Sequence, residues 1–174
     1  MLDYQKQNCN LTLREGISIY HSSFPDGKKI YKDKSEKKIW SSHDATHVIF
    51  GMDVSLEEEA ILDTWTIWGT DISLSHFLSY IKLPELKELQ NKLLSEVKIS
   101  GFLKLYKNVF RTKIKVLRRA WKMKKKWPYE FPNEFYDRKI NDLRKEYGIS
   151  ILKPEEKEFQ KLIWSGAIEG NFNA

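Results

Sequence analysis

Apolar side chains recur every three or four residues along most of the chain, the spacing of one face of an α-helix. No useful stretch shows the strict alternation of a half-buried strand, so we predict an all-α fold. Ser100-Gly101 should separate two helices, and two prolines make residues 127–133 an extended linker. We predict a single-domain bundle of about seven helices over 1–152, followed by a C-terminal helix and tail over 153–174. The helices are expected at about 13–24, 36–50, 56–69, 73–80, 84–99, 102–127 and 133–146, and the C-terminal one begins at Pro154.

Short polar residues and glycines indicate where some of these helices begin and end. Gly51 is placed just past the second helix and Gly148 just past the seventh, where a left-handed residue stops a helix. Ser55 should cap the third helix, and Glu58, three residues on, would complete a capping box.

Two of the four histidines, His43 and His47, interrupt the apolar stripe of the second predicted helix. At i and i+4 they share a face, roughly 5–6 Å apart at Cβ, and Asp44 lies about 100° round from His43. Buried imidazoles need partners, and imidazole with carboxylate suits a divalent transition metal. Glu59 is the acid on the next helix without a capping role, so it is a candidate further ligand, with Asp63 one turn beyond.

Plainer interpretations stay open. A histidine pair at this spacing is often a surface pair or a satisfied core pair. The side of the third helix that carries Glu59, Asp63, Thr66 and Thr70 is also compatible with an ordinary solvent-facing side.

Two related enzyme motifs fit less well. A zinc protease uses a glutamate as general base between its histidines, and the shorter Asp44 would not reach the metal-bound water. A metal-dependent phosphohydrolase would use His21, the adjacent pair His43-Asp44 and a distant aspartate. That interpretation leaves His47 and Glu59 without a role.

Composition restricts the class of protein. With 174 residues, 41% of them hydrophobic, the chain can form one domain with a sizeable core. Cys9 is the sole cysteine, which excludes an internal disulfide and fits a reducing compartment. No apolar run approaches the roughly 20 residues of a membrane span, and residues 1–6 resemble neither a secretory signal nor a transit peptide. We expect a cytoplasmic protein, peripheral at most on the inner membrane face.

Positive charge is concentrated in one predicted helix. Residues 102–127 carry eleven Lys and Arg and no acid; because the whole chain carries +6, the remainder sums to −5. This segment is amphipathic, so a core helix with a solvated face is one interpretation. An anionic membrane surface is the other, since each Lys or Arg near it contributes about 1 kcal/mol. No nucleic-acid-binding motif is present, and no nucleic-acid partner is expected. The predicted membrane contacts are Lys122, Lys124, Lys125 and Lys126.

The run His43-Asp44-x-x-His47, with Glu59 after eleven intervening residues, resembles the metal-binding signature of the fourth coenzyme Q biosynthesis protein family. This is an α-helical family of ubiquinone biosynthesis. Further similar segments occur in the same order, so the resemblance covers roughly residues 37–149. They are residues 47–53, 121–124 and 135–149.

The resemblance implies a site. His43, Asp44, His47 and Glu59 would bind a divalent metal ion, with zinc the first expectation and iron, manganese or magnesium the alternatives. Asp44 would be the catalytic residue, as a direct ligand, a proton acceptor or a group that orients a histidine.

The resemblance also implies a substrate: a polyprenylated aromatic ring that loses its C1 carboxylate oxidatively and gains a hydroxyl. No redox cofactor motif is present, so this step would need oxygen and a metal, or a partner enzyme. The expected partners are a prenylated quinone precursor or other isoprenoid lipid, other quinone-biosynthesis enzymes and an anionic membrane surface. The region before the motif is shorter than is usual in the family, so part of the lipid-binding wall would be either missing or supplied by the second subunit of a homodimer. The second hypothesis is a non-enzymatic prenyl-lipid-binding scaffold that organises these enzymes.

Overall fold

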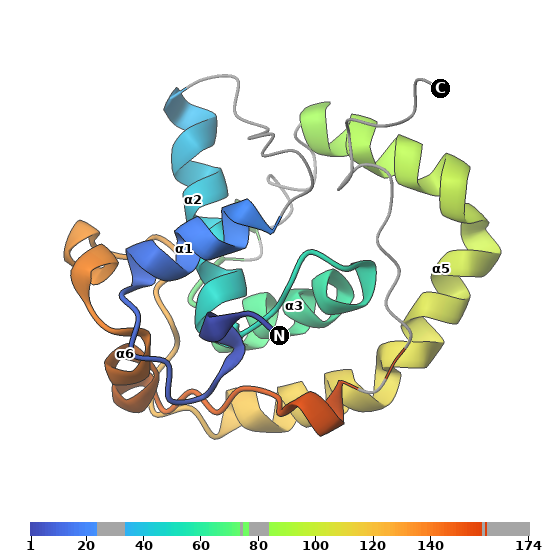
Figure 1. Ribbon diagram of the computed structural model, residues 1–174. Helices are drawn as coiled ribbons and strands as arrows, with labels where there is room; N and C mark the ends of the chain where they lie inside the picture. The colour runs from blue at the N-terminus through green and yellow to red at the C-terminus, as the bar shows by residue number, and fades with distance from the viewer. Residues whose placement is uncertain (24–33, 74, 77–83, 158, 160–174) are drawn as a thin grey trace.

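The computed structural model describes residues 1–23, 34–73, 75–76, 84–157 and 159 (Figure 1). Over these ranges the protein is all-α, as predicted, and has no β-strand. Three short 3-10 helices are present: η1 (Asp3–Gln5), η3 (Asn133–Asp137) and η4 (Pro154–Glu156). The α-helices are α1 (Leu13–Ser22), α2 (Lys34–Phe50), α3 (Leu56–Gly69), α5 (Pro84–Trp121) and α6 (Ile140–Tyr147).

The described ranges contain five α-helices rather than about seven, and one reason is the length of α5. This helix runs unbroken through Ser100-Gly101, where the sequence predicts a break. A glycine inside a helix costs only about 1 kcal/mol relative to alanine. Among the described elements, α3 and α5 form the most extensive contact, and this packing outweighs the local cost.

The predicted helix over 133–146 is instead divided into η3 and α6. Leu13 N donates to Arg138 O at 3.0 Å, and Ile140 N donates to Leu11 O at 2.9 Å. These long-range bonds hold the backbone extended between the two elements and prevent one continuous helix. Gly148 does end α6 in the left-handed conformation, as predicted (φ 70°).

Residues 127–132 form no helix, as predicted, but the segment contributes Trp127 and Tyr129 to the buried part of the fold. Trp127 is fully buried and packs against Phe135 and Tyr147, with ring centroids 5.5 and 5.2 Å away. Trp127 N donates to Gly69 O at 2.8 Å, so the segment is also tied to the end of α3. The predicted helix over 73–80 and the C-terminal helix beyond η4 fall mainly on residues outside the described ranges.

The helices are arranged so that α1 crosses α2, and the long curved α5 passes around α3 (Figure 1). Gly16 allows the first of these contacts. A Cβ at Gly16 would lie 2.6 Å from Val48 Cγ1 and 2.8 Å from Ile140 Cδ1. No described helix is both long and apolar enough to cross a membrane.

Arg144 on α6 joins three parts of the fold. Its guanidinium is fully buried and donates to five backbone carbonyls, without a carboxylate among these partners. Burial lowers the pKa of Arg144 to about 10. Since two of the carbonyls belong to the last turn of α2, Arg144 supplies donors that the helix end lacks. The five acceptors are Tyr4 O, Lys6 O, Gln7 O, Val48 O and Ile49 O.

Candidate metal centre

His43, His47 and Glu59 come together where α2 and α3 pack. Each offers one ligand atom, and these atoms lie within 4.8 Å of one another. His47 Nε2 is 3.0 Å from Glu59 Oε1, and His43 Nε2 is 3.8 Å from Glu59 Oε2. Two imidazoles and a carboxylate at this separation form a donor set suited to a divalent transition metal. The three residues are therefore a candidate metal site.

His47 gives the strongest indication that a cation belongs here. Its side chain is 0% exposed, and neither Nδ1 nor Nε2 has a hydrogen-bond partner among the described residues. The approach to Glu59 is close enough for an ion pair but does not have the direction of a hydrogen bond. An unpaired polar atom buried in a core costs free energy, and a metal ion would satisfy Nε2.

Aromatic packing fixes the plane of the His47 ring. Tyr20 of α1 stacks on it with centroids 4.5 Å apart and an interplanar angle of 24°. The His43 ring meets it edge-on at 4.7 Å. Tyr20 was not among the residues predicted for the site, because nothing local to α1 indicates that it packs on α2.

The turn between α2 and α3 sets the distance from the histidines to Glu59. Gly51 has the predicted left-handed conformation (φ 70°). Met52 N donates to His47 O at 2.8 Å and Gly51 N to Val48 O at 3.2 Å, which is the Schellman pattern of helix termination. His47 therefore lies in the last turn of α2. Its carbonyl accepts a hydrogen bond from Met52, in the loop that leads to α3, so this loop also holds the backbone of His47 in place.

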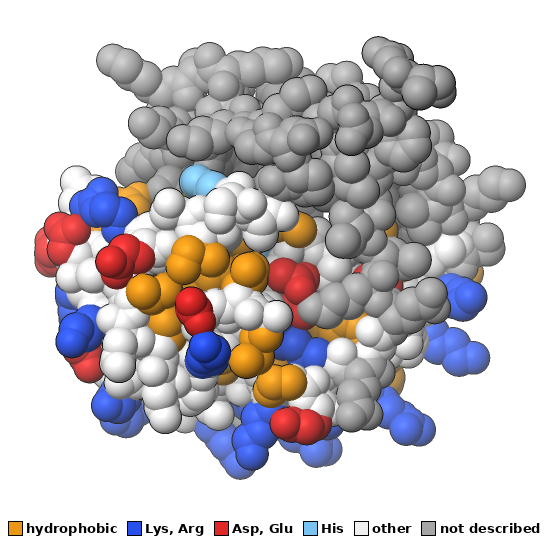
Figure 2. Space-filling view, in the orientation of Figure 1, with side chains coloured by type: hydrophobic (Ala, Val, Ile, Leu, Met, Phe, Trp, Pro, Cys, Tyr) orange, Lys and Arg blue, Asp and Glu red, His pale blue; other side chains and the backbone are white. Residues whose placement is uncertain are grey.

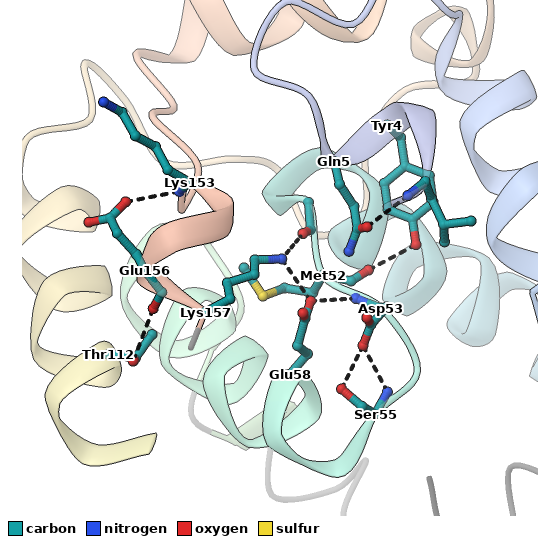
Figure 3. Close-up of polar contacts among 12 residues, drawn as sticks. Tyr4, Gln5, Met52, Asp53, Ser55, Glu58, Thr112, Lys153, Glu156 and Lys157 are labelled. Carbon is teal, nitrogen blue, oxygen red and sulfur yellow. Dashed lines mark hydrogen bonds and ion pairs between the residues drawn. The ribbon is translucent and has the colours of Figure 1, made fainter. Parts of the chain in front are cut away.

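The predicted Ser55–Glu58 capping box is wrong, although both residues do stabilise the start of α3 (Figure 3). Asp53 Oδ1 accepts from Ser55 N and Ser55 Oγ at 3.0 and 2.6 Å. Glu58 reaches back further and accepts from Asp53 N at 2.7 Å. It also pairs with Lys157 at 2.8 Å, and Lys157 Nζ donates to Gly51 O at 2.6 Å. The turn thus has a buried ion pair contributed partly by the distant residue Lys157.

Asp44 lies behind His43 rather than with the three ligand atoms. Its Oδ1 is 3.9 Å from His43 Nδ1, while His43 Nε2 faces Glu59. Its Oδ2 is 2.6 Å from His21 Nε2 and forms a hydrogen bond with it. A carboxylate on the far nitrogen of a metal-binding histidine orients the ring. Of the three roles open to Asp44, this geometry favours the orienting one; its predicted catalytic role stays a prediction.

Neighbouring charges and burial shift the pKa values of His43 and Glu59 in opposite directions. Burial lowers the pKa of His43, but the Asp44 and Glu59 carboxylates outweigh it and raise the pKa above its usual value. Burial raises the pKa of Glu59, yet attraction to His47 and His43 leaves it below its usual value. The site therefore favours a positive charge among these groups, which a metal ion would supply in place of protons.

The side of α3 that carries Glu59 is only partly exposed to solvent. Glu59 and Asp63 are half-buried, and Thr66 and Thr70 are buried, so an ordinary solvent-facing side does not describe it. Burial raises the pKa of Asp63 to about 6, with Lys113 of α5 acting in the opposite direction. Lys113 Nζ donates to Ala60 O at 2.7 Å. Asp63 therefore lies between the candidate metal centre and α5, outside the group of three ligands.

Asp44→Asn should weaken metal binding about 10–100-fold without abolishing it, because the loss of an orienting partner typically has that effect. His21→Gln should act in the same direction. His76→Gln is a matched control, since His76 is partly exposed and its Nδ1 lies 4.0 Å from Glu130 Oε1, away from the ligand group. Competition titration with a chromogenic chelator would measure the affinities. Complete loss of metal in Asp44→Asn would instead make Asp44 a direct ligand, and unchanged affinity would remove it from the site.

In comparisons with known proteins, no family model, curated protein or solved structure matches the chain.

Proposed function

We propose that this protein binds a divalent metal ion through His43, His47 and Glu59 and acts on a polyprenylated aromatic ring that carries a carboxylate. The single observation that carries the proposal is the His43–His47–Glu59 group, in which both ring nitrogens of the buried His47 lack a hydrogen-bond partner within the described part of the chain. The spacing of the same three residues underlies the resemblance to the ubiquinone-biosynthesis family. The donor set and the sequence motif thus support the same site.

The reaction supported best is oxidative decarboxylation with hydroxylation of the ring carbon. The bond from C1 to the carboxylate breaks and CO₂ leaves, while one oxygen atom of O₂ becomes the new phenol hydroxyl. The other oxygen atom leaves as water after taking up two electrons and two protons from a two-electron reductant, which a partner reductase would supply. A bound metal ion would act as a Lewis acid toward the carboxylate.

The chain's own residues would prepare this site. Tyr20 stacks on the His47 ring, and Asp44, which His21 contacts at 2.6 Å, would orient the His43 ring through its Nδ1, 3.9 Å away. The apolar surroundings of α2 and α3 would exclude bulk water and strengthen electrostatic interactions with the substrate carboxylate.

One contact favours a second candidate function. His21, His43 and Asp44 are the residues that a metal-dependent phosphohydrolase of the His–Asp type would use, and His21 does contact Asp44 at 2.6 Å. The non-enzymatic prenyl-lipid scaffold also stays a hypothesis, because it needs the fold and the lipid but no turnover.

Turnover assays distinguish the three functions. The metal-loaded protein would receive a C1-carboxylated prenylated phenol, O₂ and reduced flavin, and release of labelled CO₂ would be measured. We expect metal-dependent release that is lost in Glu59→Gln and retained in Glu155→Gln, an exposed acid on η4. No release from metal-loaded protein would overturn the oxidative reaction. Turnover of phosphomonoesters that is lost in His21→Gln would assign the hydrolase, and a co-purifying isoprenoid without any turnover would assign the scaffold.

A further inference from the structure

Large apolar side chains are exposed along one side of α5. Apart from Met1, every such exposed residue among the described ones lies on α3 or α5. Leu103, Phe110 and Trp121 are 70%, 60% and 66% exposed. These three side chains and the other apolar residues between them recur every three or four residues, over about 27 Å of helix. This surface, here called the α5 stripe, comprises the half-buried Leu117 and the exposed residues Leu103, Tyr106, Phe110, Ile114 and Trp121.

The α5 stripe continues onto α3 through Trp68. The rings of Trp68 and Trp121 meet edge to face with centroids 6.3 Å apart. Trp68 also lines a groove of about 1410 Å³ together with Tyr106, Phe110 and Ile114. A continuous exposed apolar surface of this kind marks an interaction site.

Basic side chains lie beside the α5 stripe, on the side away from the core. Figure 2 shows Lys and Arg side chains along the lower and right-hand edges of the molecule, where α5 runs in Figure 1. No acidic residue occurs in 102–127, so these charges have no acidic partner within that part of the chain. The exposed cations are Lys104, Lys107, Arg111, Lys115, Arg118 and Lys122.

Two of the four lysines predicted to contact a membrane are engaged within the protein. Lys125 pairs with Glu146 at 2.6 Å and lies over the Tyr147 ring at 4.3 Å. Lys124 Nζ donates to Lys145 O at 3.1 Å. Exposed apolar and basic side chains therefore occur together along α5, and this surface is larger than the one around residues 122–126.

We propose that the α5 stripe, with the cations beside it, docks on the surface of an anionic lipid bilayer. A helix with Leu, Phe and Trp on one face and Lys and Arg on the adjoining face lies in the plane of the interface, with its apolar side chains among the upper acyl segments. Tyr and Trp are suited to the headgroup level, and long basic side chains extend to the phosphates. This surface is independent of the metal centre.

Two other occupants fit the charges and side chains less well. A second copy placed stripe against stripe would bring together two copies of the segment 102–122, whose charged side chains are all positive, and like charges oppose association. A nucleic acid would neutralise the cations but would leave Leu103, Phe110 and Ile114 in water.

Vesicle flotation of the full chain tests the proposal. Vesicles of phosphatidylcholine with roughly 30% phosphatidylglycerol would be compared with phosphatidylcholine alone. Lys107→Glu/Arg111→Glu/Arg118→Glu should lower partition onto anionic vesicles about a hundredfold or more, because each basic residue contributes about fivefold. The control, Lys139→Glu/Lys145→Glu/Lys153→Glu, has the same net charge but should retain most of the partition. Leu103→Ser/Phe110→Ser should reduce it at least about tenfold, since both side chains bury apolar area in the bilayer.

Several results would overturn the proposal. The first is equal flotation of the Leu103→Ser/Phe110→Ser variant and the wild type, and the second is an equal loss in both triple variants. Retention on single-stranded nucleic acid without flotation would assign the basic face to that partner. A concentration-dependent dimer that the stripe variant loses, without flotation, would assign the stripe to a second copy. Metal content should stay at the wild-type level in every variant, so these failures are distinct from failure of the metal centre.

Discussion

Purified wild-type protein should contain about one divalent metal ion per chain, and the Glu59→Gln variant should contain almost none. The substitution preserves the size of the side chain but removes the charge that lies 3.0 Å from His47 Nε2. Because Glu59 is 38% exposed, its replacement should leave the fold intact. Elemental analysis after desalting measures the ion, and chelator competition should show an affinity lowered more than about a hundredfold, beyond the effect of an orienting partner.

His47→Ala should abolish metal binding as well, with helical content near that of the wild type. It also removes a ring that stacks on Tyr20, so some loss of stability is expected. Asp63→Asn is the control, since Asp63 lies one turn along α3 and outside the ligand group. Full metal content in Glu59→Gln would refute the proposed site. Loss of metal in Asp63→Asn alone would make Asp63, in place of Glu59, the carboxylate ligand. Lipid extracted from the same samples would show whether an isoprenoid co-purifies.

Arg144→Met should destabilise the protein by about 3–5 kcal/mol, the size expected when a buried hydrogen-bonded charge is removed. The guanidinium supplies donors to five backbone carbonyls, and methionine fills a similar volume without any donor. Buried carbonyls left without partners cost about 1–3 kcal/mol each. The removal of a costly buried charge offsets part of this loss, as the lowered pKa of Arg144 indicates.

Urea unfolding followed by far-UV circular dichroism measures the effect. Arg14→Met is the matched control, because the Arg14–Asp137 ion pair is exposed and should contribute less than about 1 kcal/mol. Arg144→Met should also weaken metal binding, since Arg144 donates to Val48 O and Ile49 O beside His47. Equal unfolding midpoints for Arg144→Met and the wild type would show that neighbouring groups or water satisfy these carbonyls instead.

Features set by short-range rules were predicted correctly from the sequence. The bounds of α3, the left-handed stops at Gly51 and Gly148 and the all-α class depend on residues within a few positions of one another. The i,i+4 histidines share a helix face for the same reason. Glu59 was identified by elimination, and it does meet the histidines, although the capping role assigned to Glu58 in that reasoning was wrong.

Long-range contacts decided the rest. The bonds of residues 138 and 140 to residues 11 and 13 interrupt a helix that local propensity would continue. Packing on α3 carries α5 through a glycine, and burial of Trp127 makes a core segment of a proline-containing linker.

The surroundings of the candidate site depend on tertiary structure in the same way. Asp44 meets His21 from 23 residues away, and Arg144 reaches α2 across more than ninety residues. Spacing along the chain shows which residues share a face of one helix. It does not show which other helix that face meets, because this depends on how apolar surfaces and buried polar groups are satisfied across the whole fold.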